Sequence, residues 1–317
     1  MNNNTLSLLS LLPEYRDYVW GGQKLRPGKR TAEAWIIHET DQVGPGSPFA
    51  GKTLGELSET FGELLLGSIT IKKTGQRFPL LVKILESVEW LSIQVHPNDL
   101  QAVALEGPGH FGKTEAWVVL EAEVGSSLLA GLKPGVSSEK LRDSIRSGEV
   151  AEICQKFPVQ PGQAFFIEPG TLHSIGPGLL IYEIQQASDI TYRVFDWNRP
   201  AAAGRQLHIE KSIEVTKFDS VVKPISAPNL NKNDQITLLD CDYFRLMLLS
   251  VKGTSLIQET RGESFHILTV IEGEVKVEYE SKTVKLKQFE TILVPACCSL
   301  YTIISEGSAK ILKSKVI

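Results

Sequence analysis

The chain has 317 residues, of which 42% are hydrophobic and 22% are charged, as in an ordinary globular protein. This length predicts about two domains, or one large β domain with additions. The net charge of −4 excludes a strong basic field, and no apolar run is long enough for a membrane span, so we expect neither a nucleic-acid nor a membrane partner. The four cysteines lack a disulfide-type spacing, which favours a cytoplasmic protein.

Strand patterns outnumber helix patterns in the first two thirds of the chain. Short runs rich in Val, Ile, Leu and aromatic residues predict strands over residues 80–85, 90–96, 115–121, 164–167 and 179–186. Helices are predicted over residues 53–66, from Asn98 onward, over 139–146 with Ser138 as the N-cap, and, on weaker spacing, over 209–218.

Residues 222–235 are polar and contain two prolines, which predicts a linker. Further strands are predicted after it, over 243–250, 264–271, 274–279, 283–286, 291–294 and 300–304. Many close strands separated by turns are typical of a sandwich or barrel. We therefore predict a mainly β fold with two modules, residues 1–221 with a few helices and residues 236–317.

A polar stripe runs through the predicted strand 90–96. Residues two apart on a strand share a face, so Ser92, Gln94 and His96 line up together. The alternative interpretation is the solvent-facing side of an edge strand, because His and Gln are commonly exposed.

A second histidine, His173, follows the turn Pro169-Gly170 after an apolar strand, and such a turn fixes the direction of the imidazole. The alternative is a hairpin with an incidental histidine. Glu115 opens another apolar strand and could supply the carboxylate that two imidazoles need beside a divalent metal. With Gln94 this set suits zinc, although Mn, Co, Ni or Fe fit by ligand type.

Together these motifs resemble one family, the type I mannose-6-phosphate isomerases in their short bacterial form, within the cupin superfamily. The resemblance extends over most of the first two thirds of the chain, and its motifs are residues 18–22, 32–35, 94–97, 112–117, 169–178 and 183–197. The resemblance implies cupin-type jelly-roll barrels and the interconversion of mannose 6-phosphate and fructose 6-phosphate. It also implies one zinc ion per chain with the ligands Gln94, His96, Glu115 and His173. By the same resemblance, Arg193 is an active-site residue, and three others surround the sugar phosphate: Ser92, Lys113 and Glu183.

The reaction implied by the resemblance moves a proton between C1 and C2 through an enediol. Arg193 stays protonated, so we expect it to hold phosphate or enediolate oxygens rather than act as the base. Its alternative is a scaffold pair with Asp189 or Asp196. Glu183, in an apolar strand, is either a proton-transfer group or half of a buried ion pair. Lys113 holds phosphate, relays a proton or is a solvated loop lysine. Glu183, Lys113 and a hydroxide on the metal all remain open as the base.

The C-terminal module departs from a metal-binding cupin. Ser299 stands where His173 stands in the first module, and His266 has no Gln-x-His pair beside it, so we predict a metal-free structural domain. The alternative is a cryptic second site. Two rival functions remain: a cupin dioxygenase or epimerase, and a non-catalytic sugar-binding protein. The expected partner is a small-molecule sugar phosphate, and the expected assembly is a monomer or a weak homo-oligomer.

Overall fold

The computed structural model describes residues 5–199, 205–228, 230 and 233–317. These residues form nineteen strands and seven helices, which confirms the predicted mainly β fold. The chain divides into two compact units. The first unit comprises Met1–Glu14, Trp35–Leu81 and Ala227–Ile317, and the second unit comprises Tyr15–Ala34 and Val82–Ser226.

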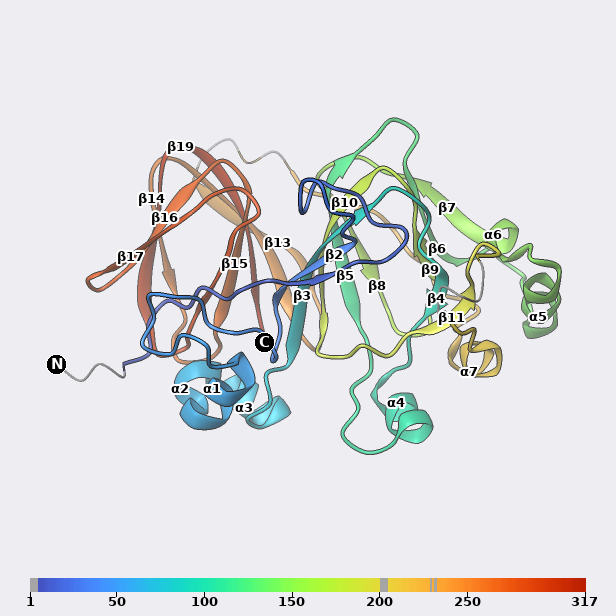
Figure 1. Cartoon of the computed structure of the whole chain (residues 1–317), viewed down its shortest axis with the longest axis horizontal. Helices are drawn as coiled ribbons and strands as arrows, with labels where there is room; N and C mark the ends of the chain where they lie inside the picture. Colours follow the sequence, from blue (N-terminus) through green and yellow to red (C-terminus); the bar gives the residue numbers. More distant parts are fainter. Residues whose placement is uncertain (1–4, 200–204, 229, 231–232) are drawn as a thin grey trace. The chain divides into compact units, whose positions relative to one another are not determined.

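Two sheets carry the strands of the second unit (Figure 1). The seven-stranded sheet has the order β1 (Glu14–Arg16), β2 (Glu33–Ile37), β3 (Leu80–Ser87), β10 (Leu179–Gln186), β5 (Glu115–Ala122), β8 (Gln163–Ile167) and β12 (Ile225–Ser226). The five-stranded sheet has the order β11 (Tyr192–Phe195), β4 (Ile93–Val95), β9 (His173–Ile175), β6 (Ser127–Leu132) and β7 (Cys154–Pro158). The division between the units falls within β1, β2 and β3.

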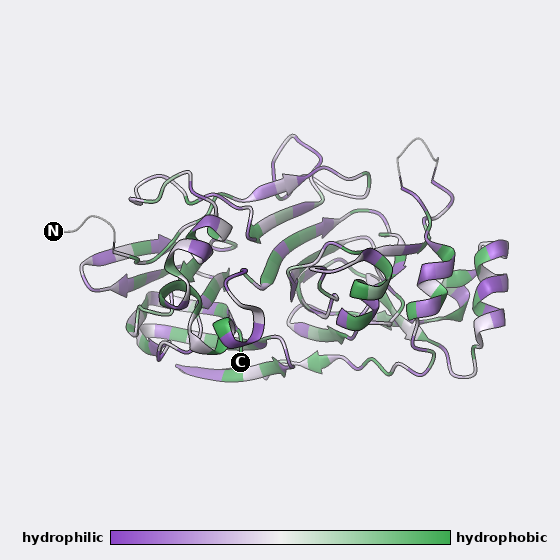
Figure 2. Cartoon of the chain, turned by 90° about the horizontal axis from the view of Figure 1, so that it is seen from below, coloured by the Kyte–Doolittle hydropathy of each residue, from purple (hydrophilic) through white to green (hydrophobic). Residues whose placement is uncertain are grey.

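The two sheets of the second unit enclose apolar side chains, and buried polar residues interrupt them. One core cluster includes Trp20, Trp117 and Phe165. Every residue of β3 and β10 is buried, although each strand carries charged side chains. Burying a charge is costly unless it is paired, so these strands must supply partners for one another. Figure 2 shows hydrophobic and hydrophilic segments interspersed along the strands.

The helices of the second unit follow their predicted capping signals closely. The helix predicted from Asn98 is α4 (Asp99–Glu106), with a capping box between Asn98 and Gln101. The helix α5 (Ser138–Ser147) is capped by Ser137, whose side chain accepts from the Lys140 amide, rather than by the predicted Ser138. Beside it lies α6 (Val150–Ile153), and the predicted helix 209–218 is the shorter α7 (Ile209–Val215).

In the first unit, the prediction of a single helix over residues 53–66 is wrong. Gly62 adopts a φ of +46°, which breaks the run into α1 (Leu54–Phe61) and α2 (Glu63–Leu66). A further helix, α3 (Ser68–Thr74), follows Gly67, and all three helices lie at one end of the strands of this unit (Figure 1).

The first unit also contains one sheet, in which two strands are much longer than predicted. Its order is β13 (Asp234–Asp240), β14 (Arg245–Glu259), β19 (Leu300–Lys315), β15 (His266–Glu272) and β18 (Thr291–Val294), with β16 (Val275–Tyr279) and β17 (Lys282–Leu286) beside β19. The β14–β19 pairing continues across a register shift between Lys252 and Thr254. This bulge, with Gly253 at positive φ, has the sequence of a turn and explains the short prediction.

Among the described residues, the strand pairing does not close any sheet into a barrel, so the predicted jelly-roll barrels are supported only as mainly β modules. The predicted linker contains β12 and the first residues of β13, and the predicted domain boundaries stay a prediction. None of the helices in the described part of the chain has the length and apolar character needed to cross a membrane.

Candidate metal centre

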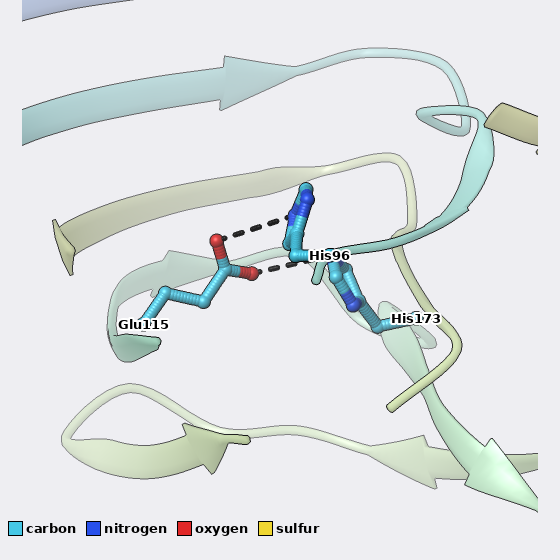
Figure 3. Close-up of side chains that lie close together, drawn as sticks. All are labelled: His96, Glu115 and His173. Atoms are coloured by element: carbon cyan, nitrogen blue, oxygen red, sulfur yellow. Dashed lines mark ion pairs between the residues drawn. The ribbon is translucent and has the colours of Figure 1, made fainter. Parts of the chain in front are cut away.

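Three buried side chains of the second unit converge on one point (Figure 3). His96 directly follows β4, His173 opens β9, and Glu115 opens β5. His173 Nε2 lies 3.2 Å from Glu115 Oε1, and His96 Nε2 lies 3.5 Å from Glu115 Oε2. The three potential ligand atoms lie within 4.8 Å of one another. The two sheets therefore bring together residues that are far apart in the sequence.

Both imidazole rings are oriented by the backbone. His96 Nδ1 donates to the Ile190 carbonyl oxygen at 2.8 Å, and His173 Nδ1 donates to the Thr171 carbonyl oxygen at 2.9 Å. With the proton on Nδ1, each Nε2 turns its lone pair toward Glu115. Within the described part of the chain, His96 Nε2 is buried without a hydrogen-bond partner. A buried imidazole nitrogen left without a partner in this way is available to a metal ion.

The protonation states suit a cation as well. Burial lowers the pKa of His173 to about 4 and the pKa of His96 well below its ordinary value, so both rings are neutral at pH 7. Burial also raises the pKa of Glu115 to about 8, against the opposing charge of Lys113, whose Nζ lies 3.3 Å from Glu115 Oε2. One lysine does not fully stabilise the buried carboxylate, and a divalent cation would. Two neutral imidazoles and a carboxylate are a suitable donor set for it.

Gln94 lies next to this group. It is the direct cross-strand partner of His173 between β4 and β9, and the side-chain Nε2 of Gln94 lies 3.3 Å from His173 Nε2. Ser92, two residues earlier, donates from Oγ to Gln94 Oε1 at 3.4 Å. The structure thus gathers all four predicted ligand residues around one point, and it places Ser92 beside them.

The predicted residue Glu183 is both paired and exposed to a pocket. Its Oε1 lies 3.1 Å from Lys83 Nζ, and its Oε2 accepts from Trp117 Nε1 at 2.9 Å. Although burial opposes it, the charges of Lys83 and Lys113 hold the pKa of Glu183 below its ordinary value. Lys83 also lies 3.6 Å from Glu33. Glu183, Lys83 and Lys113 line the same pocket of about 450 Å³, which His173 and Gln94 also line.

Arg193 on β11 is the cross-strand partner of Gln94 on β4, and it lines the same pocket. Its Nε donates to Ser92 Oγ at 3.2 Å, and its Nη1 donates to the Gln206 carbonyl oxygen at 3.0 Å. Among the described residues it forms no ion pair, so the alternative scaffold pair with Asp189 or Asp196 is not present. Lys113, at 3% exposure, is not a solvated loop lysine either.

Sequence reasoning missed two basic residues that line the pocket, Lys83 and Arg205. Lys83 had a signal, because it is a lone charge within the apolar run 80–85 and a buried lysine needs a carboxylate partner. Nothing in the sequence around Arg205 distinguishes it from a surface arginine. Only the fold brings it to the pocket.

Comparison with known proteins places the chain in a family. The model of the type I phosphomannose isomerase catalytic domain matches residues 8–110, and that of the mannose-6-phosphate isomerase cupin domain matches residues 234–316. Mannose-6-phosphate isomerase ManA of Bacillus subtilis is 34% identical over 308 residues, which cover 92% of this chain and 94% of the relative. This chain belongs to the mannose-6-phosphate isomerase family. The resemblance predicted from the sequence is thereby confirmed.

Other members of the mannose-6-phosphate isomerase family agree. The enzyme of that name from Streptococcus mutans is 33% identical, with 90% of this chain and 92% of the relative covered. The crystal structure of the mannose 6-phosphate isomerase from Bacillus subtilis is 32% identical and matches with a TM-score of 0.86 over 98% of this chain and 99% of the other. A mannose 6-phosphate isomerase structure bound with zinc and yttrium is 16% identical and shares the fold, with a TM-score of 0.75 over 98% of this chain and 99% of the other. This chain therefore shares the overall fold of both solved isomerase structures.

Proposed function

We propose that this chain is a metal-dependent aldose–ketose isomerase that interconverts mannose 6-phosphate and fructose 6-phosphate. The observation that carries the proposal is the convergence of His96, Glu115 and His173 beside a pocket of about 450 Å³, in a chain of this family. A pocket of that volume suits a small sugar phosphate. The exchange has no net redox change, so it needs no nicotinamide.

Gln94, His96, Glu115 and His173 would hold one divalent ion per chain, and we propose zinc because its ligands are commonly imidazole nitrogens and carboxylate oxygens. When bound, the cation stabilises the negative charge that develops on the sugar oxygens. As a ligand Gln94 would present Oε1, so its carboxamide would turn over from the orientation in which Nε2 faces His173.

Glu183, Lys113 and Arg193 are the residues that we propose to act on the sugar. Glu183 lines the pocket and is held ionised, so it can accept a proton from the C1–C2 region at neutral pH. Trp117 and Lys83 fix its orientation. Lys113 stabilises the ionised form of Glu115 and offers its remaining donors to sugar oxygens. Arg193 stays protonated and binds oxyanions through its planar fork.

The proposal includes three finer expectations from the sequence. Each β module closes as a cupin jelly roll, the chain works as a monomer or weak homo-oligomer, and it works in the cytoplasm. Light scattering of the purified protein measures the second of these directly.

A coupled assay on mannose 6-phosphate, before and after chelation, tests the proposed function. We expect turnover in the purified protein, a loss of at least about 100-fold on chelation, and recovery when zinc is added back. Unchanged turnover in metal-free protein would refute the metal dependence. Binding of the sugar phosphate without conversion would favour a non-catalytic protein, and iron with oxygen-dependent turnover would favour a dioxygenase.

A further inference from the structure

Two adjacent cysteines lie in the turn that links β18 to β19 in the first unit. Cys297 is partly exposed, whereas Cys298 is buried. Cys298 belongs to the apolar core of this unit, and Cys297 packs against the same core from the surface. The two thiols form a hydrogen bond with each other, in which Cys298 donates to Cys297. One reachable sulfur atom therefore has a second sulfur atom directly beside it.

The backbone of this turn is held from two sides. The Cys297 amide donates to the Leu64 carbonyl oxygen of α2 at 2.9 Å. The Thr260 amide donates to the Ser299 carbonyl oxygen at 2.9 Å. Within the turn, the Ser299 amide donates to the Cys297 carbonyl oxygen, also at 2.9 Å. These bonds fix the two cysteines in the turn, so the contact between the thiols is built into the fold.

The contact makes the two thiols chemically unequal. The hydrogen bond from Cys298 lowers the pKa of Cys297, against the opposing effects of burial and of the Glu280 charge. The same hydrogen bond, together with burial, raises the pKa of Cys298. Cys297 therefore ionises first, and the thiolate is the reactive form of a cysteine. A reactive, accessible thiolate next to a second thiol is the arrangement that undergoes reversible oxidation.

The other two cysteines lack these properties. Cys154 is buried in β7, and burial raises its pKa to about 12. Cys241 Sγ donates to the Phe244 carbonyl oxygen at 3.4 Å, and burial raises its pKa as well. In the described part of the chain, neither forms a hydrogen bond with another thiol. They serve as internal controls for the pair.

We propose that Cys297 and Cys298 form a site of reversible two-electron oxidation by hydroperoxides. The Cys297 thiolate attacks one oxygen of hydrogen peroxide, the O–O bond breaks, hydroxide leaves, and Cys297 becomes a sulfenic acid. The Cys298 sulfur then bonds to the Cys297 sulfur and displaces the hydroxyl group, which leaves as water with the Cys298 proton. The first hydroxide takes up the proton that Cys297 released, so one peroxide and two thiols give one disulfide and two waters.

The spacing of the two cysteines makes the product easy to reduce. Adjacent Cα atoms lie about 3.8 Å apart, whereas the cysteines of an ordinary disulfide have Cα atoms about 4.4–6.8 Å apart. A disulfide between neighbours is therefore strained, and strained disulfides are reduced more readily than structural ones. The same spacing that is unsuitable for a permanent cross-link suits a bond that forms under oxidation and opens again with a thiol.

Thiol counting on the purified full-length protein tests the site. After one equivalent of hydrogen peroxide, the four free thiols should fall to two, and the peptide that contains both adjacent cysteines should lose about 2 Da. Dithiothreitol should restore all four. Cys154→Ser and Cys241→Ser, as matched controls, should each fall from three thiols to one. Loss of thiols elsewhere, or a disulfide between two copies of the chain, would overturn the proposal.

Two variants separate the two steps. Cys298→Ala should stop at the sulfenic acid, so dimedone should label Cys297 about 10-fold more than in the wild type. Cys297→Ala should leave Cys298 unoxidised. In the wild type, which needs no variant to fold, iodoacetamide at pH 7.5 should alkylate Cys297 at least about 10-fold faster than Cys241. Equal alkylation rates, or a Cys297→Ala variant that still loses thiols to peroxide, would show that the pair has no special reactivity.

Discussion

Both units bury histidine side chains, two in the second unit and one in the first among the described residues, and their environments differ in what the rings face. In the second unit, the Nε2 atoms of His96 and His173 face the Glu115 carboxylate. In the first unit, His266 Nδ1 lies 2.9 Å from the Tyr301 hydroxyl, and no carboxylate among the described residues forms an ion pair with it. A buried imidazole becomes a candidate ligand when its neighbours leave a nitrogen without a hydrogen bond and supply negative charge.

The charges near His266 also differ from those near His96 and His173. Lys313 Nζ contacts Gln258 Oε1, and burial together with the charge of Lys315 lowers the pKa of Lys313 to about 8. Burial and these two lysines also lower the pKa of His266 well below its ordinary value. Positive neighbours would repel a cation that Glu115 attracts. The metal-free character of the C-terminal module nevertheless stays a prediction until its metal content is measured.

Matched histidine substitutions test this contrast with the largest expected effect. His173→Ala should lose tightly bound metal and lower kcat/KM by about 10³-fold or more, because it removes a ligand while the chain stays folded. His266→Ala, equally buried, should retain both metal and turnover. Metal analysis and the coupled assay on both variants decide the matter. Equal losses in the two variants would show that burial of the ring, not ligation, matters.

Arg193→Lys distinguishes metal binding from oxyanion binding within the second unit. The variant should retain its metal and lose about 10- to 100-fold in kcat/KM, because a point charge cannot replace two parallel hydrogen bonds. Metal content and steady-state constants measure the two effects separately. A wild-type rate would contradict the proposed role, and a loss of metal would move Arg193 into the ligand framework.

The sequence alone predicted many of the strands, one helix cap and the site residues, because local patterns determine strands and caps. The strands β10 and β18 match their predicted bounds, and the resemblance placed His96, Glu115 and His173 in one site. Capping residues such as Asn98 are also local, which explains the success with α4.

Long-range pairing was the part that the sequence did not reveal. Lys83 was treated as part of an apolar strand, although its partner Glu183 lies on the neighbouring strand β10. Arg205 lines the pocket because it pairs with Asp196 and donates to Ser92, both distant from it in the sequence or set by the fold of the neighbouring strands. In the other unit, β14 continues through a bulge at Gly253 that has the composition of a turn. Each case depends on a partner strand that no local window contains.

The pH dependence of stability should differ between metal-free and metal-loaded protein. In the metal-free fold Glu115 has a pKa of about 8, against 4.5 as its ordinary value, so the fold binds a proton that the unfolded chain has released. The free energy of unfolding should therefore fall as pH rises from 6.5 to 8, by up to about 1.4 kcal/mol per pH unit. His173 acts in the opposite sense, because its pKa of about 4 lies below 6.5, and it reduces stability only as pH falls from 6.5 toward 4.

Urea denaturation of metal-free wild type and Glu115→Gln at pH 6.5 and pH 8 measures this slope. In Glu115→Gln the free energy of unfolding should fall much less between pH 6.5 and pH 8, because glutamine does not titrate. In the wild type, added zinc should abolish the same fall by stabilising the ionised carboxylate. An unchanged slope in Glu115→Gln would show that another group titrates in this range.

The smallest effect is expected for Tyr301→Phe in the first unit. This substitution removes the hydroxyl that bonds to His266 Nδ1 and leaves a buried imidazole nitrogen unsatisfied, so the free energy of unfolding should fall by about 1–3 kcal/mol. Metal content and kcat should not change. Trp117→Phe is its counterpart in the second unit, because it removes the Nε1 donor to Glu183 and should lower stability and turnover together. A loss of metal or turnover in Tyr301→Phe would mean that the His266 environment contributes to function, and that hydrogen-bond satisfaction alone does not separate a packed histidine from a ligand.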